Sequence, residues 1–117
     1  MFMSDPASDP LVTFAEFSKV QLRIGRVTHA EAIPGMTKVF KATIDLGSEQ
    51  RDLVVGGAPF YAPSEFVGRV VVVCTNLEPK KIAGMISRGM LLAADGPEGK
   101  PIFLTAEGEA PLGAQIH

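Results

Sequence analysis

The chain has 117 residues, of which 46% are hydrophobic and 21% charged, with a formal net charge of −2. These values are typical of one ordinary globular domain and exclude a disordered chain or a second domain with its own core. The longest apolar run, residues 70–74, falls far short of the ~20 residues that cross a bilayer. Residues 1–10 also lack the basic start and apolar centre of a signal peptide. We therefore expect a soluble cytoplasmic protein without a membrane partner.

Residues suited to catalysis or metal binding are scarce. The single cysteine, Cys74, rules out an internal disulfide, and its apolar run is typical of a small buried hydrophobe. His29 and His117 are too far apart to form a metal-ligand cluster of usual spacing. Neither paired carboxylates nor a phosphate-cradling glycine motif is present. The pattern therefore indicates a protein that is not an enzyme and has no metal or other cofactor.

The charge is unevenly distributed along the chain. Residues 11–94 contain ten bases and seven acids, a net charge of +3, whereas residues 95–117 contain four acids and one base. Phosphate binding depends on a local basic face more than on the charge of the whole chain. The charge pattern therefore permits a nucleic-acid partner without requiring one.

The N-terminal part combines a tail with a short helix. Residues 1–12 alternate Pro and Asp with little to bury, which predicts a mobile tail. Thr13 and Glu16 have the spacing of a capping box, so a short helix is expected to begin there. We expect Phe14 and Phe17 to face the core from this helix.

Two strands are predicted next. The first alternates polar and apolar residues, and a phase slip at residues 25–26 indicates a bulge or bend. Its buried face would hold Val20, Leu22 and Ile24. A turn at residues 33–35 leads to a second alternating strand at residues 37–46. The buried face of the second strand would hold Phe40, Ala42, Ile44 and Leu46.

The middle of the chain continues this pattern. A hairpin turn at residues 47–50 is expected to lead into a strand at residues 51–55. Two prolines exclude residues 58–66 from a central strand, although residues 63–66 can form one helical turn. Residues 68–75 are nearly all apolar, which predicts a strand buried on both faces.

The last part is expected to contain shorter elements. We predict a loop at residues 76–89, short strands at residues 90–94 and 102–104, and an extended end at residues 110–117. Four or five core strands with short helical pieces and Gly/Pro turns indicate a small all-β barrel or sandwich. The pattern leaves open whether this is an OB barrel or another small barrel.

Residues 76–94 carry the most informative motif, Asn-Leu-x-Pro-x-Lys-x-x-Gly-x-x-Ser-x-Gly-Met-x-Leu-Ala. The motif closely resembles that of the tRNA-binding OB-fold domain, which occurs as a stand-alone dimeric protein, in methionyl- and phenylalanyl-tRNA synthetases and in synthetase-associated cofactors. Weaker agreement extends back to residue 14. Two departures are Gln21, where Asp is common, and Gly56–Gly57, where Ser-Gly is usual. The matching positions are Asn76, Leu77, Pro79, Lys81, Gly84, Ser87, Gly89, Met90, Leu92 and Ala93.

The resemblance implies a fold and an assembly. The fold would be an OB-fold five-stranded barrel with short helical segments and a C-terminal extension. Residues 13–117 would form the tRNA-binding domain, with residues 95–117 as a dimerisation extension. This extension has more apolar residues than a free tail needs. The implied partners are tRNA, a second copy of the chain in a homodimer, and an aminoacyl-tRNA synthetase that the protein aids in trans.

Three lysines are candidate phosphate ligands. Lys80 and Lys81 follow a proline, and their flexible ammonium groups can meet phosphate oxygens. Lys38, in another loop, resembles a lysine that the family uses for tRNA. On residue type alone, each can equally be a solvated surface lysine.

Other polar and apolar residues complete the candidate tRNA-binding site. Asn76 can pair with a base edge or a ribose hydroxyl, or bond to backbone in a turn. Ser87 can donate to a phosphate or 2′-OH, or cap a turn. Met90 can lie under an exposed base or ribose, or pack in the core. The resemblance implies that Ser87 and Met90 lie at the binding surface, and Arg23 and Arg51 are further candidates for the basic face.

The expected mode of recognition follows from the scarcity of aromatic residues. The chain has no Trp and one Tyr, so base stacking is weakly supplied. Recognition of tRNA shape through backbone and 2′-OH contacts suits these residues better. Two alternatives remain: a secretion-chaperone-like protein of the same fold that binds unfolded peptides, and a module that only docks to a synthetase.

Overall fold

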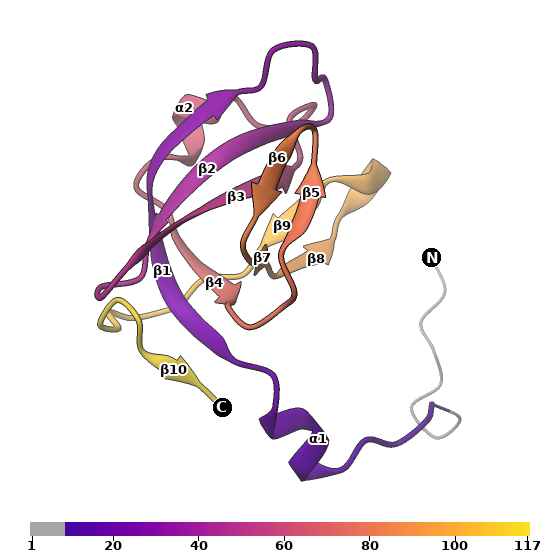
Figure 1. Ribbon diagram of the computed structural model, residues 1–117, viewed down its shortest axis with the longest axis vertical. Coiled ribbons are helices and arrows are strands. Elements are labelled where there is room, and N and C mark those ends of the chain that lie inside the picture. The colour runs from indigo at the N-terminus through magenta and orange to yellow at the C-terminus, as the bar shows by residue number, and fades with distance from the viewer. Residues whose placement is uncertain (1–8) are drawn as a thin grey trace.

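The structure is a computed structural model that describes residues 9–117 (Figure 1). Most of the tail predicted at residues 1–12 lies outside this range, and residues 9–12 are exposed and belong to no helix or strand. No helix in the described part of the chain is long and apolar enough to cross a membrane. The elements are α1 (Phe14–Ser18), β1 (Leu22–Ala32), β2 (Val39–Asp45), β3 (Gln50–Gly56), α2 (Pro63–Phe66), β4 (Val70–Cys74), β5 (Lys80–Ile82), β6 (Met85–Ser87), β7 (Met90–Leu91), β8 (Ala93–Asp95), the 3-10 turn η1 (Pro97–Gly99), β9 (Pro101–Phe103) and β10 (Gln115–Ile116).

The main sheet is antiparallel and curls into a barrel. Its strands follow the order β3-β2-β1-β4-β7, and the long β1 pairs with β4 through its first half and with β2 through its second. A register shift between Val27 and His29 marks the irregularity in β1, slightly later than the predicted slip at residues 25–26. Contacts of β6 and β7 with β3 nearly close the barrel. The predicted all-β OB-type fold is therefore confirmed.

The core fills the barrel from the predicted faces. Phe66, at the end of α2, is fully buried and meets the ring of Phe40 edge-on at a centroid distance of 5.2 Å and that of Phe103 at 4.9 Å. Fully burying such a side chain contributes about 1.5–3 kcal/mol. The buried cluster consists of Val27, Phe40, Ala42, Ile44, Leu46, Leu53, Val55, Phe66, Val71 and Val73.

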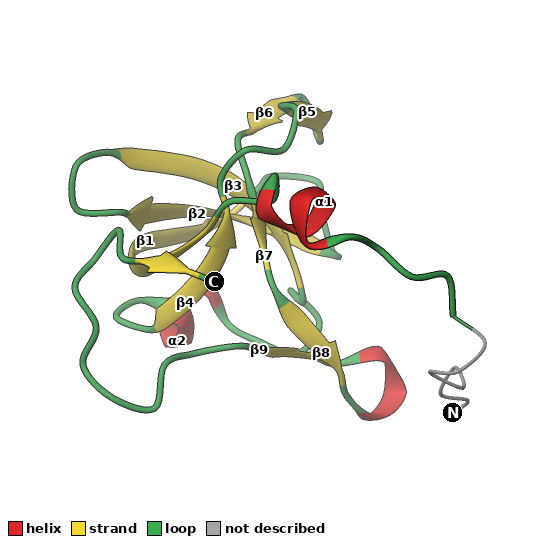
Figure 2. Cartoon of the chain, turned by 90° about the horizontal axis from the view of Figure 1, so that it is seen from below, coloured by secondary structure: helices red, strands yellow, loops and turns green. Residues whose placement is uncertain are grey.

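The N-terminal helix differs from the prediction. The capping box forms, because Thr13 accepts from the Glu16 N–H while the Glu16 carboxylate accepts from the Thr13 N–H. The expected core positions are wrong, however, since Phe14 is 84% exposed, Phe17 48% and Val20 45%. The cause is placement: β1 begins only at Leu22, and α1 projects beyond the end of the barrel (Figures 1 and 2).

Residues 76–89 also differ, because the predicted loop contains a hairpin. β5 and β6 pair around a turn in which Ala83 has φ 53° and Gly84 has φ 78°. Two successive positive φ values are typical of the type I′ turn that best joins two twisted strands. The hairpin stands out from the barrel (Figure 2). The strand predicted at residues 90–94 is divided into β7 and β8.

The C-terminal segment packs on its own barrel. The Gly113 N–H donates to the Ile24 carbonyl at 2.7 Å, and the Ile24 N–H donates to the Ala114 carbonyl at 3.0 Å. β10 then pairs with the start of β1. A Cβ atom on Gly113, whose φ is +85°, would lie 2.3 Å from the Leu46 carbonyl oxygen. Only glycine therefore fits where this segment crosses the end of β2.

Candidate nucleic-acid interface

An open groove of about 900 Å³ lies where β3, the β5–β6 hairpin and the β7–β8 segment meet. Much of its lining is apolar and accessible: Phe60 is 39% exposed, Leu77 46% and Met90 48%. Lys38 and Lys80 also line it. The groove thus places two cations beside apolar surface, a combination suited to a ligand with both charged and flat apolar parts.

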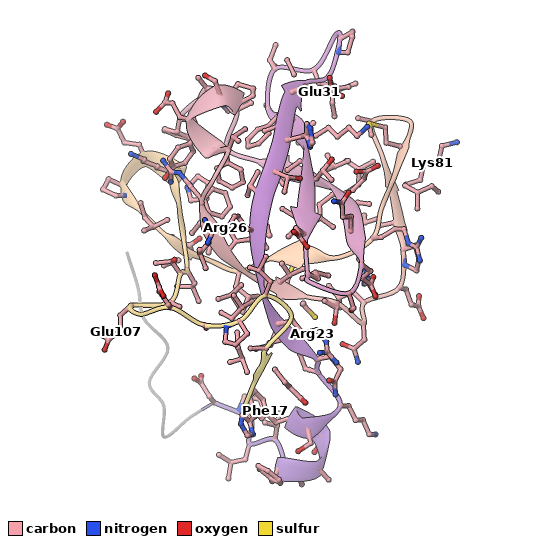
Figure 3. All side chains as sticks on the ribbon, turned by 90° about the vertical axis from the view of Figure 1, so that its left-hand side faces the viewer. Phe17, Arg23, Arg26, Glu31, Lys81 and Glu107 are labelled. Atoms are coloured by element: carbon pink, nitrogen blue, oxygen red, sulfur yellow. The ribbon has the colours of Figure 1, made fainter. Side chains whose placement is uncertain are left out.

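The hairpin has two faces that carry different side chains. Residues opposite one another in paired strands share a face, and the register pairs Lys80 with Ser87 and Lys81 with Ile86. Lys80, Ile82 and Ser87 line the groove, whereas Lys81 and Ile86 do not. Figure 3 shows Lys81 pointing away from the barrel. Two lysines that are adjacent in sequence therefore lie on opposite faces of the hairpin.

Ser87 joins the hairpin to the barrel. It is only 4% exposed, its Oγ accepts from the Val54 N–H at 3.0 Å, and it donates to the Gly89 carbonyl at 3.4 Å. The next residue, Arg88, donates its N–H to the Asp52 carbonyl at 3.2 Å. These bonds connect β6 to β3, so the Ser87 hydroxyl takes the place of a backbone group where the barrel closes.

Asn76 uses its side-chain amide within the protein. Its Oδ1 accepts from the Gln21 N–H at 2.8 Å, and its Nδ2 donates to the Lys19 carbonyl. These bonds tie the start of β1 to the segment between β4 and β5. Asn76 therefore bonds to backbone as the alternative expectation had it, but to distant segments, 55 and 57 residues away, and not within a turn.

A second, polar cleft of about 280 Å³ lies outside the groove and is lined by Arg23, Arg51, Glu49 and Asn76 among others. The Arg51 guanidinium forms an ion pair with Glu49 and donates to the Thr75 carbonyl. The hydrogen bond and charge of Arg51 lower the pKa of the Glu49 carboxyl. Arg51 therefore holds the start of β3 against the end of β4.

Arg23 borders the same cleft and is partly engaged. Its Nη1 donates to the Gly113 carbonyl at 2.9 Å, which ties β1 to the C-terminal segment. Figure 3 shows Arg23 on β1 near this segment. One edge of the Arg23 guanidinium thus stabilises the packing of the C-terminal segment on β1.

The predicted site residues consequently divide into two groups and one separate member. Lys81 lies on the outer face of the hairpin. The groove group consists of Lys38, Lys80, Ser87 and Met90. The cleft group consists of Arg23, Arg51 and Asn76.

Sequence reasoning missed part of the groove. Phe60 is not among the predicted site residues, although its position after Pro59 in a segment without strand character was a usable signal. Leu77 is a motif residue whose exposure the pattern did not reveal. Gly56 and Gly57, one of the two departures from the family pattern, both line the groove.

The lysines around the hairpin have free charges. Within residues 9–117, Lys38, Lys80 and Lys81 take part in no ion pair. Lys41 on β2 differs, because its ammonium lies 3.8 and 3.9 Å from two carboxylates. The hairpin region therefore presents lysines that form no ion pair within the described part of the chain.

Comparison with known proteins places this architecture in a family. Residues 22–115 match the family described as "Putative tRNA binding domain". The chain is 46% identical over 105 residues to a methionine–tRNA ligase of Pyrococcus furiosus, covering 90% of this chain and 14% of that protein. It is 44% identical over 110 residues to the Thermotoga maritima ligase, covering 94% of this chain and 17% of that protein. The chain thus spans only about a sixth of these relatives.

Solved structures give the same grouping. A MetRS-related protein from Pyrococcus horikoshii superposes with a TM-score of 0.87 at 36% identity, covering 93% of this chain and 100% of that one. The chaperone CsaA of Bacillus anthracis superposes with a TM-score of 0.83 at 29% identity, covering 92% and 100%. With the barrel and its hairpin, the sequence match over residues 22–115 establishes that this chain belongs to the tRNA-binding domain family, a family of non-catalytic binding domains.

Proposed function

We propose that this chain binds tRNA without acting on it chemically, using the groove and the β5–β6 hairpin, and that it aids an aminoacyl-tRNA synthetase in trans in the cytoplasm. The observation that carries the proposal is the position of Lys38 and Lys80, which line an accessible apolar groove and form no ion pair within residues 9–117. Phosphate oxygens are the natural ligands of such exposed ammonium groups.

The groove lining suggests how the tRNA is arranged. Glu78 and Asp95 also line the groove, and their carboxylates disfavour a phosphate near them. The phosphates then lie at Lys38 and Lys80, while Met90 supports an exposed base or ribose as a polarisable apolar platform. This mode recognises backbone and shape more than sequence.

The other predicted residues act mainly by positioning. Three of them use their polar side chains within the protein. Ser87 and Asn76 form hydrogen bonds with backbone groups, and Arg51 bonds to a backbone carbonyl and to Glu49. Hydrogen bonds of this kind hold the hairpin and the strand ends that carry the lysines. In this proposal, these three residues shape the site, and the lysines and Met90 meet the tRNA.

Titration with total tRNA at increasing salt tests the proposal. Each lysine that neutralises a phosphate contributes about 0.7–0.9 to the slope of log affinity against log salt. Lys38→Ala and Lys80→Ala should each lower both affinity and slope, whereas Lys19→Ala should change neither. Lys19 is a matched control because it is exposed and directly follows α1, which lies away from the hairpin turn (Figure 1). Absence of wild-type binding at low salt would refute the proposal.

A second candidate is binding of unfolded peptides, as in a secretion-chaperone-like protein of this fold. The exposed apolar side chains Phe60, Leu77 and Met90 favour it, as does the structural likeness to CsaA. Suppression of the aggregation of a denatured enzyme, measured beside tRNA binding, separates the two. Suppression that is lost in Phe60→Ser, in a protein without tRNA affinity, would support this candidate instead.

A third reading is a module that only docks to a synthetase. The similarity to methionine–tRNA ligases supports testing a synthetase of this kind as the partner. Co-purification of the synthetase together with an absence of tRNA affinity would favour docking alone. Binding of both the synthetase and tRNA would agree with a protein that aids the synthetase in trans.

We also propose that the chain is a homodimer. Besides residues 95–117, where Ile102 and Leu104 are 42% and 44% exposed, the N-terminal arm presents uncovered apolar side chains. Solution scattering of the wild type should give the mass of two chains. The double variant Phe14→Ser/Phe17→Ser should give a lower average mass. A monomeric mass for the wild type would refute the dimer. The apolar side chains of the arm are Leu11, Val12, Phe14, Phe17 and Val20.

A further inference from the structure

The β5–β6 hairpin separates two cationic surfaces. The inner surface is the groove side, with Lys80 on the hairpin and Lys38 across the groove. The outer surface starts with Lys81, which the pairing register places opposite Ile86 and away from the groove lining. Ile86 is 55% exposed, so the outer face also has accessible apolar surface.

The outer surface continues into the polar cleft. Arg88 follows Ser87 directly, is exposed and does not line the groove. The Arg51 guanidinium donates to the Arg88 carbonyl at 3.3 Å, and Arg51 lines the polar cleft together with Arg23 and Glu49. With two arginines and one carboxylate in the cleft and the exposed Arg88 next to it, this side of the hairpin has excess positive charge.

One extended RNA strand does not satisfy both surfaces. Side chains on opposite faces of a two-stranded ribbon point in opposite directions, so a phosphate at Lys80 is separated from Lys81 by the hairpin itself. Folded RNA offers the matching shape, because two backbones flank the wide, shallow minor groove of an A-form helix.

Building on the proposed tRNA binding, we propose that the β5–β6 hairpin inserts between two phosphate backbone segments of folded RNA. Lys80 then meets one segment, and Lys81 with Arg88 meets the other. The hairpin turn points between the two segments, and Ile86 lies against riboses of the outer one. The Ser87 and Arg88 bonds to β3 hold the hairpin upright for this insertion.

Salt titrations with the full chain and a methionine tRNA transcript test this arrangement. Lys80→Ala and Lys81→Ala should each reduce the salt slope by about 0.7–0.9, and the double variant should lose both contributions. Lys81→Arg should retain the slope, and Lys19→Ala should match the wild type. With an unstructured RNA of equal length, only one of the two lysines should matter, because only one face is occupied.

Hydroxyl-radical footprinting gives a second, positional readout. The wild type should protect two separate backbone segments of the transcript. Lys81→Ala with Arg88→Ala should expose one segment, and Lys80→Ala with Lys38→Ala should expose the other. A single protected segment, or an unchanged slope for Lys81→Ala beside a reduced one for Lys80→Ala, would overturn the insertion while leaving tRNA binding intact. Failure of the wild type to bind the transcript at all would instead overturn the proposed function.

Discussion

Replacing Ser87 with alanine removes the hydroxyl that joins the hairpin to the barrel. Ser87 is 4% exposed, and its Oγ accepts from the Val54 N–H at 3.0 Å. Without this acceptor the N–H loses its partner, which costs about 1–3 kcal/mol. In a domain of this size, 1 kcal/mol lowers Tm by roughly 4–6 °C. We therefore expect Tm to fall by about 4–18 °C.

Thermal unfolding and amide hydrogen exchange together check this expectation. The Val54 amide should exchange faster in Ser87→Ala than in the wild type, because it has lost its acceptor. Ser64→Ala is the matched control, since Ser64 is exposed on α2 and surface changes of this kind stay within about 0.5 kcal/mol. An unchanged Tm with a fully protected Val54 amide would refute the reasoning.

The same variant distinguishes positioning from direct contact with tRNA. If Ser87 acts by holding the hairpin, Ser87→Ala lowers tRNA affinity but keeps the salt slope, because no cation is lost. Affinity should also recover partly at low temperature, where the hairpin is more ordered. Lost affinity in a protein of unchanged stability would point to a direct hydrogen bond from Ser87 to the tRNA.

Three further changes have expected outcomes. Gly113→Ala should destabilise the fold by about 1–3 kcal/mol in urea unfolding, because its Cβ would lie 2.3 Å from a carbonyl oxygen, whereas Gly35→Ala, at φ +81° with no neighbour within 4 Å, should cost less. Ala83→Asn should slow hydrogen exchange in the hairpin, since asparagine tolerates the φ of 53° better than alanine. The pKa of Glu49 is lowered from 4.5 by Arg51, so its ion pair stabilises the fold above that pH. Urea unfolding at several pH values should therefore show the wild type losing stability relative to Glu49→Gln as the pH falls below 4.5.

The barrel strands were predictable because their signal is local. In β2, alternation at period two places Phe40, Ala42 and Ile44 on one face, and all three are fully buried. The apolar run that forms β4 indicated burial on both faces for the same reason, and residues 71–74 are buried. A pattern within one strand is sufficient when the strand lies against the core of its own chain.

The N-terminal helix is the element for which the hydrophobic pattern gave a wrong prediction. The apolar character of Phe14 and Phe17 predicted burial, but it does not say which surface would cover them. The barrel is complete without them, because Phe66 of α2 already packs among the core aromatics. Hydrophobicity therefore predicted a burial of Phe14 and Phe17 that the barrel does not provide.

The motif named candidate site residues, but it did not predict what their side chains do in the fold. The motif identified Asn76 and Ser87 as special residues, and both occupy defined positions. Their hydrogen-bond partners, however, lie 55 and 33 residues away in sequence, at Gln21 and Val54. These distant partners determine which polar side chains form hydrogen bonds within the protein and which remain free for a ligand. Residue type alone therefore does not predict the role of each side chain.

The lysine pair at the hairpin shows how a single turn sets the directions of two neighbouring charges. In a loop, Lys80 and Lys81 can both rotate toward one phosphate, but in a strand adjacent side chains point to opposite faces. Residues 80–82 are a strand only because they pair with residues 85–87 across a turn with two positive φ values. In the proposed RNA complex, the local geometry of Ala83 and Gly84 would therefore determine whether the two charges meet one RNA segment or two.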